Sequence, residues 1–69
     1  MKSLTFVGID PNNPQRAIMR GVLDSGKEKT ESWDADTLRE AAKNHMHYRR
    51  FEIVTECWKA LELLTSQST

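Results

Sequence analysis

Residues 34–66 read DADTLREAAKNHMHYRRFEIVTECWKALELLTS and make up nearly half of the chain. This stretch contains neither Gly nor Pro, and it carries both Leu-rich and basic segments. Asp34 and Asp36 are favourable N-cap residues, and the spacing from Thr37 to Glu40 fits a capping box. The sequence therefore predicts that residues 35–65 are helical.

The polar side chains of this stretch change face part-way along it. At about 100° per residue, the polar faces of the two halves differ by roughly 150° around the helix axis. One straight helix packed on one surface does not present polar side chains in this way. Either the helix breaks near residues 44–49, or one long helix packs its halves against different surfaces. We prefer the break.

The apolar stripe of the second half occupies more than half of the helix circumference, whereas an ordinary surface helix needs ~100° or somewhat more. We expect a second copy of the chain to bury the excess in a homodimer. The alternative is that the first helix covers it. The predicted partner interface consists of Phe51, Val54, Trp58, Leu61 and Leu64.

The residues before this stretch predict a β-meander. Residues 3–10, 16–24 and 27–33 each have strand character, and Asp24-Ser25-Gly26-Lys27 predicts a tight turn in which Gly26 supplies a positive φ. The third strand is polar and alternates in charge, which is typical of an edge strand, and Trp33 is its large anchor.

The first strand is apolar on both faces. Alternation places Leu4 and Phe6 on one face, and Thr5, Val7 and Ile9 on the other. We therefore expect this strand to be central or covered on both sides. The predicted fold is a single α+β domain over residues 1–69: a three-stranded antiparallel meander, then one broken or two consecutive C-terminal helices packed on the sheet.

Length and composition exclude several classes of protein. A chain of 69 residues buries only ~60% of the surface that it exposes when unfolded, and its single cysteine excludes an internal disulfide. Oligomerisation is therefore the expected supplement to the core. Ten basic and ten acidic side chains give no net charge, unlike nonspecific nucleic-acid binders. The lone cysteine and the absence of a signal-peptide-like or membrane-spanning apolar run predict the cytoplasm.

One basic cluster stands out within the helical part. It is a candidate contact for a polyanion or an acidic partner, and it also fits a solvated helix face paired with nearby glutamates. Two arginines of the second predicted strand extend this candidate contact. The residues are Lys43, His47, Tyr48, Arg49 and Arg50, with Arg16 and Arg20 on the strand.

The remaining reactive side chains have structural interpretations. His45 and His47 lie two residues apart and face apart on a helix, so no metal site is predicted. Cys57 falls on the apolar face beside Trp58, as a buried thiol does.

Two resemblances bear on function. Residues 7–11, VGIDP, resemble the first strand of RuvC-type nucleases, in which the Asp holds a metal. These 69 residues do not hold that family's later strands and carboxylates, so Asp10 is interpreted as a turn residue that caps the Pro-Asn-Asn loop. Three strands leading through an acidic turn into a helix are also similar, in layout and not in motif, to AP2-like and integrase arm-type DNA-binding domains.

No nucleophile–base pair is visible, and no enzyme activity and no cofactor are predicted. We expect a small interaction or regulatory protein that acts through protein–protein contacts as a homodimer, of the kind that bacterial and phage genomes encode as accessory factors. The alternative is a nucleic-acid-binding module that uses Arg16, Arg20 and the basic cluster.

Overall fold

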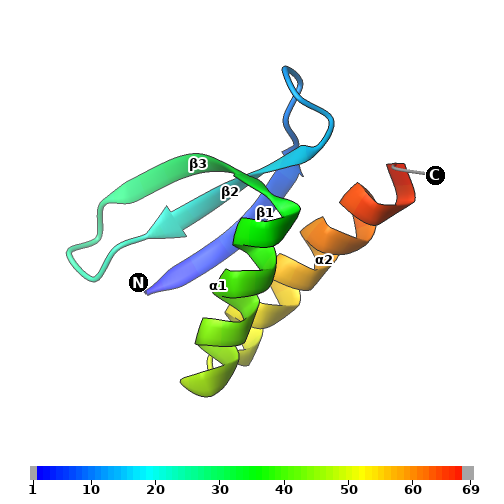
Figure 1. The fold of residues 1–69 in the computed structure, drawn as a ribbon. Helices are drawn as coiled ribbons and strands as arrows, with labels where there is room; N and C mark the ends of the chain where they lie inside the picture. The colour runs from blue at the N-terminus through cyan, green and yellow to red at the C-terminus, as the bar shows by residue number, and fades with distance from the viewer. Residues whose placement is uncertain (1, 68–69) are drawn as a thin grey trace.

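A computed structural model describes residues 2–67 and has three strands followed by two helices (Figure 1). Both helices pack on the sheet, whose strands are antiparallel in the order β1-β2-β3. The predicted α+β fold and the predicted break in the helical part are therefore confirmed. The elements are β1 (Ser3–Ile9), β2 (Arg16–Val22), β3 (Glu28–Asp34), α1 (Ala35–His47) and α2 (Phe51–Gln67).

The hairpin between β2 and β3 turns at Gly26, as predicted. Gly26 has a φ of 89°, which a residue with a side chain rarely adopts. Its N–H donates to the Leu23 carbonyl at 2.9 Å, and the Leu23 N–H donates to the Lys27 carbonyl at 2.8 Å. These bonds close the turn, and the polar β3 lies at the sheet edge, as expected.

The expectation that β1 is central or covered on both sides is wrong, because β2 is the middle strand and the Val7 side chain is 60% exposed. A β-bulge explains the difference. Phe6 pairs with Met19 but Gly8 pairs with Ile18, so Val7 is an extra residue in β1. Beyond the bulge the alternation is reversed, and Ile9 returns to the core side with Leu4 and Phe6.

Helix α2 protects the outer edge of β1. The Phe6 N–H donates to the Glu56 carboxylate of α2 at 3.1 Å, a bond that joins residues 50 positions apart in the chain. An unpaired edge strand otherwise offers free N–H groups for pairing with other chains. Glu56 thus takes the place of a neighbouring strand at this point.

Asp34 caps α1. Its Oδ1 accepts a hydrogen bond from the Thr37 N–H at 2.9 Å, and this bond lowers the pKa of the Asp34 carboxyl below its usual value. Asp36 lies instead within the first turn, where it pairs with Arg39. The predicted capping box starting at Thr37 is wrong, since Thr37 is the residue that Asp34 caps.

The break between the helices is a C-terminal cap motif without glycine. Arg49 has a φ of 59°, its N–H donates to the Met46 carbonyl at 3.0 Å, and the Arg50 N–H donates to the His45 carbonyl at 2.9 Å. This pair of bonds defines a Schellman motif, in which Gly usually takes the left-handed position. The chain reverses here, so the two helices lie side by side (Figure 1).

The core lies between the sheet and the helices. Cys57 is fully buried in it, and burial raises the pKa of its thiol to about 11, so the predicted structural role is confirmed. Neither described helix is long and apolar enough to cross a membrane. The buried core residues are Leu4, Ala17, Met19, Leu38, Ala42, Ile53, Val54, Cys57, Ala60, Leu61 and Leu64.

Candidate interaction surfaces

The residues of the predicted partner interface separate into two groups. Val54, Leu61 and Leu64 are at most 6% exposed and belong to the core of the single chain. Phe51 and Trp58 are 58% and 55% exposed. The sheet and α1 thus cover much of the wide apolar stripe, which is the alternative that the sequence left open. Only the two aromatic side chains of the set remain accessible.

Trp58 borders a groove that we call the helix groove. The groove has a volume of about 580 Å³. Ala42 is buried, while Met46 and Trp58 keep about half of their surface exposed. The groove therefore combines an accessible apolar centre with charged neighbours. Its lining residues are Asp36, Arg39, Glu40, Ala42, Lys43, Met46 and Trp58.

The charged residues of the helix groove lie on one face of α1. Asp36, Arg39, Glu40 and Lys43 follow the i, i+3, i+4, i+7 spacing, and all four are exposed. Within the chain, Arg39 pairs with Asp36 at 2.7 Å. From the start of α1 the charges read negative, positive, negative, positive.

The predicted basic cluster lies at the turn between the helices, which we call the basic tip (residues 47–51). The Arg50 guanidinium carbon is 5.6 Å from the centre of the Tyr48 ring, and the His47 ring meets Tyr48 edge-on at 5.3 Å. Tyr48 is 64% exposed. Lys43 lies one turn earlier on α1 and also lines the helix groove.

A second cavity adjoins the basic tip. It has a volume of about 540 Å³ and lies where the start of β1 approaches the helix turn. Its lining residues are Lys2, Arg49, Arg50, Phe51, Glu52 and Ile53.

Arg16 and Arg20 lie away from the basic tip, on the sheet face opposite the core. Their neighbours Ala17 and Met19 point into the core, so the arginines point to the other side. The Arg16 guanidinium donates to Ser32 at 3.2 and 2.8 Å, and Arg20 is paired with Glu28. The structure therefore does not bring the two predicted basic groups together.

Asp10 has the predicted turn role. Its carboxylate accepts hydrogen bonds from the Asn12 N–H at 2.9 Å and from the Ser32 hydroxyl at 2.6 Å. The bond from Ser32 contributes most to holding the pKa of Asp10 below its usual value. Among residues 2–67, no group of three or more His, Cys, Asp or Glu side chains is arranged to hold a metal ion.

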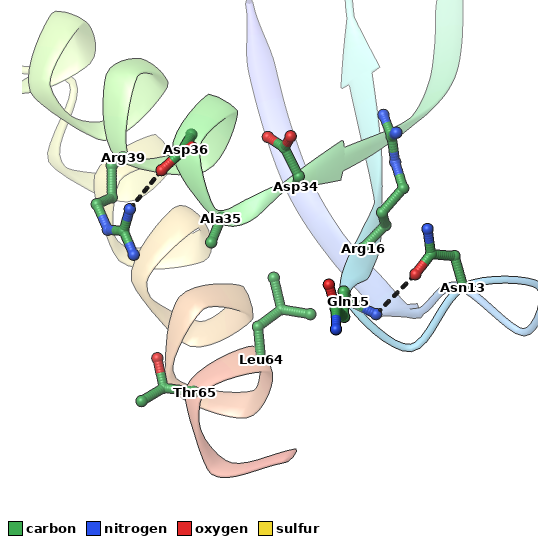
Figure 2. A pocket seen from close by; sticks show the side chains of 9 residues that line it. All are labelled: Asn13, Gln15, Arg16, Asp34, Ala35, Asp36, Arg39, Leu64 and Thr65. Atoms are coloured by element: carbon green, nitrogen blue, oxygen red, sulfur yellow. Dashed lines mark hydrogen bonds and ion pairs between the residues drawn. The ribbon is translucent and has the colours of Figure 1, made fainter. Parts of the chain in front are cut away.

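A polar cavity of about 480 Å³ lies at the opposite end of the helices, beside the start of α1 (Figure 2). Its charged side chains are already engaged: Asp36 pairs with Arg39, Arg16 binds Ser32, and Asp34 caps α1. We assign no ligand to it for that reason. Its lining residues are Asn13, Gln15, Arg16, Asp34, Ala35, Asp36, Arg39, Leu64 and Thr65.

His45 lies on α1 near the helix turn, and the sequence predicts no site there. It is half-buried, and its Nδ1 is buried without a hydrogen-bond partner among the described residues. Burial lowers the pKa of His45, and the positive charge of Arg50 lowers it further. Helical periodicity distinguishes it from the exposed His47, because His47 falls on the polar face and His45 falls on the face of Leu38 and Ala42. The extent of its burial depends on how α1 is rotated on the core.

Comparison of the chain with models of protein families, with curated proteins and with solved structures finds no match in any of the three.

Proposed function

We propose that this chain is a self-associating interaction protein, and that the helix groove docks a second copy of the chain. The single observation that carries the proposal is the exposed Trp58 beside a charged face that complements itself. The partner is the same chain, related by a two-fold axis. Apolar contact and charge complementarity both support this arrangement.

The apolar contact between the two copies would come from Trp58 and Met46. Large aromatic side chains dominate the free energy of most interfaces when they enter an apolar cleft, and Met adapts its shape to a partner. Trp58 and Met46 are 55% and 48% exposed and line the same groove. A chain of 69 residues also has a small core, so burial of these side chains in a dimer supplies stability that one copy lacks.

The charge complementarity would come from the order of charges along α1. When two copies of α1 run antiparallel, Asp36 faces Lys43 of the second copy, and Arg39 faces Glu40 of the second copy. The two-fold axis repeats both pairings, because a symmetric interface uses the same patch on each chain. Every charge of this face then meets its opposite. A parallel arrangement in register instead places like charges against each other.

The test is the solution mass of the chain by sedimentation equilibrium. We expect a mass about twice that of one chain at micromolar concentration, and the mass of one chain for Trp58→Ser. Leu63→Ser is the matched control, since Leu63 is also exposed on α2, at 44%, but does not line the groove. A monomer at high micromolar concentration, or equal weakening by both substitutions, contradicts the proposal.

A charge exchange tests the antiparallel register. Lys43→Asp alone places two acidic groups together across the axis and should weaken the dimer. Adding Asp36→Lys to the same chain restores opposite charges and should recover most of the lost affinity. Failure of the double variant to recover, while the original chain is dimeric, would reject this register and leave the docking site in place.

A further inference from the structure

We propose that the basic tip, with the adjoining cavity, binds single-stranded nucleic acid. This inference does not depend on the helix groove, which uses other residues of the two helices. The phosphates would meet Arg49, Arg50 and Lys2, and the bases would stack on Tyr48 and Phe51.

The basic tip carries a local excess of positive charge. Ion pairs neutralise four basic residues elsewhere: Arg20 with Glu28, Lys29 with Glu31, Arg39 with Asp36 and Lys59 with Glu56. Arg16 and Lys27 form none within residues 2–67, but they lie at opposite ends of the β2–β3 hairpin. At the basic tip and its adjoining cavity, Lys2, Arg49 and Arg50 form no ion pair within residues 2–67. Residues 43–51 contain no acidic residue at all. A chain with no net charge therefore has a positive end, which attracts a polyanion.

The basic tip also presents a pair of exposed aromatic rings. Tyr48 is 64% exposed and Phe51 is 58% exposed, and both border the turn between the helices. Proteins that bind single strands combine a positive groove with aromatic side chains on which bases stack. Arg50 already lies near the Tyr48 ring, at 5.6 Å, so a cation and an aromatic face are next to each other.

The shape of the adjoining cavity also fits a nucleotide. The cavity of about 540 Å³ places Lys2, Arg49 and Arg50 around one space with Phe51. Glu52 is the only acidic residue that lines it. A phosphate near the cations and a base against Phe51 therefore fit one nucleotide step, with Tyr48 available for the next base.

Hydrogen bonds hold the backbone of the basic tip in one conformation. Arg49 takes a left-handed conformation, and the two hydrogen bonds of the Schellman motif hold it there. The start of this side chain is thus positioned before any ligand arrives, which reduces the conformational entropy lost on binding.

These features favour a single strand over other polyanions. In a duplex the bases are stacked on each other and do not offer their faces to Tyr48 or Phe51. An acidic peptide or an anionic membrane matches the cations but gives no flat ring for stacking. Contacts to the phosphates and to the base faces carry little sequence preference, so we expect none that is strong.

The test is fluorescence anisotropy with a labelled oligothymidylate. We expect binding at low salt that weakens as salt rises, with the logarithm of affinity falling by about 0.7 per neutralised phosphate for each logarithmic unit of salt. Arg49→Gly combined with Arg50→Ala should reduce affinity at least about tenfold at low salt, and Tyr48→Ala should reduce it roughly tenfold through lost stacking. Leu63→Ser should bind as the original chain does, because Leu63 is exposed but lines neither the helix groove nor the cavity beside the basic tip.

Arg20→Ala is the matched control, because it removes one positive charge from the open sheet face. It should keep the original affinity. No binding at low salt overturns the proposal, and so does an equal loss of affinity in Arg20→Ala. Binding to polyglutamate or to anionic phospholipid vesicles as strong as to the oligonucleotide, with no effect of Tyr48→Ala, also overturns it, since charge alone would then account for the binding.

Discussion

Arg49 occupies the position at which the backbone passes from α1 to α2. A left-handed conformation costs a residue with a Cβ atom about 1–2 kcal/mol, and glycine adopts it without that cost. The surrounding hydrogen bonds to the Met46 and His45 carbonyls hold Arg49 in place despite the cost. Arg49 therefore makes the fold less stable than glycine would at this position.

Arg49→Gly should raise the free energy of unfolding by about 1 kcal/mol, because it removes the strain while keeping the turn. Urea denaturation measures the change. Arg50→Gly is the control, since Arg49 is the only described residue other than glycine with a positive φ. Arg50→Gly adds freedom to the unfolded chain without relieving strain and should destabilise the protein. A loss of stability in both variants would mean that the Arg49 side chain supports the fold.

The contrast between Gly26 and Arg49 shows what single residues predict. Gly26 stands in a turn sequence between two strand-like runs, and the hairpin could be predicted from it. Nothing at Arg49 favours a left-handed residue, and only the change of polar face indicated a break. The exact position of the break could therefore not be predicted from the sequence.

At the scale of elements, β1 depends on a side chain from α2 for its outer edge. Glu56→Ala removes the acceptor for the Phe6 N–H and should lower the free energy of unfolding by about 1 kcal/mol. Amide hydrogen exchange should be faster at Phe6 in this variant. Glu62→Ala, at an exposed position of the same helix, should leave the exchange at Phe6 unchanged. Unchanged exchange at Phe6 in Glu56→Ala would show that this bond adds no protection.

Which side chains of β1 point to the core could not be predicted, for a physical reason. Alternation of side chains holds only while the hydrogen-bond ladder is continuous, and the bulge at Val7 interrupts it. Likewise, helical periodicity placed one apolar set on a single face: Phe51, Val54, Trp58, Leu61 and Leu64. Which of them stay exposed depends on the side on which α1 packs, and this contact is decided by the turn at residues 48–50.

His45 makes the free energy of unfolding depend on pH, in a range different from that of Glu56. Its ordinary pKa is 6.5, and burial lowers the pKa in the folded state. As pH falls below 6.5, the unfolded chain takes up this proton first, so stability present above that pH is lost toward the folded-state pKa. The ordinary pKa of Glu56 is 4.5, and the hydrogen bond from Lys59 lowers it. The contribution of Glu56 to stability is therefore lost only at more acidic pH.

We therefore expect the urea midpoint to fall between pH 7.5 and pH 5.5, and His45→Leu to remove most of that fall. His47→Leu is the control, because His47 is exposed, and it should keep the fall. A profile that is flat in the original chain over this range would show that His45 takes up its proton equally well in both states.

The contact between α2 and β1 joins the last described element to the first. The strands of the meander and the two helices each meet their neighbours in sequence, but the core closes only when these distant segments meet. Bringing these segments together loses chain entropy before their contacts form, so this step should limit the rate of folding. During synthesis, Leu4 and Met19 would stay open to water until α2 has left the ribosome, and the uncovered edge of β1 would be most prone to pairing with other chains in that interval.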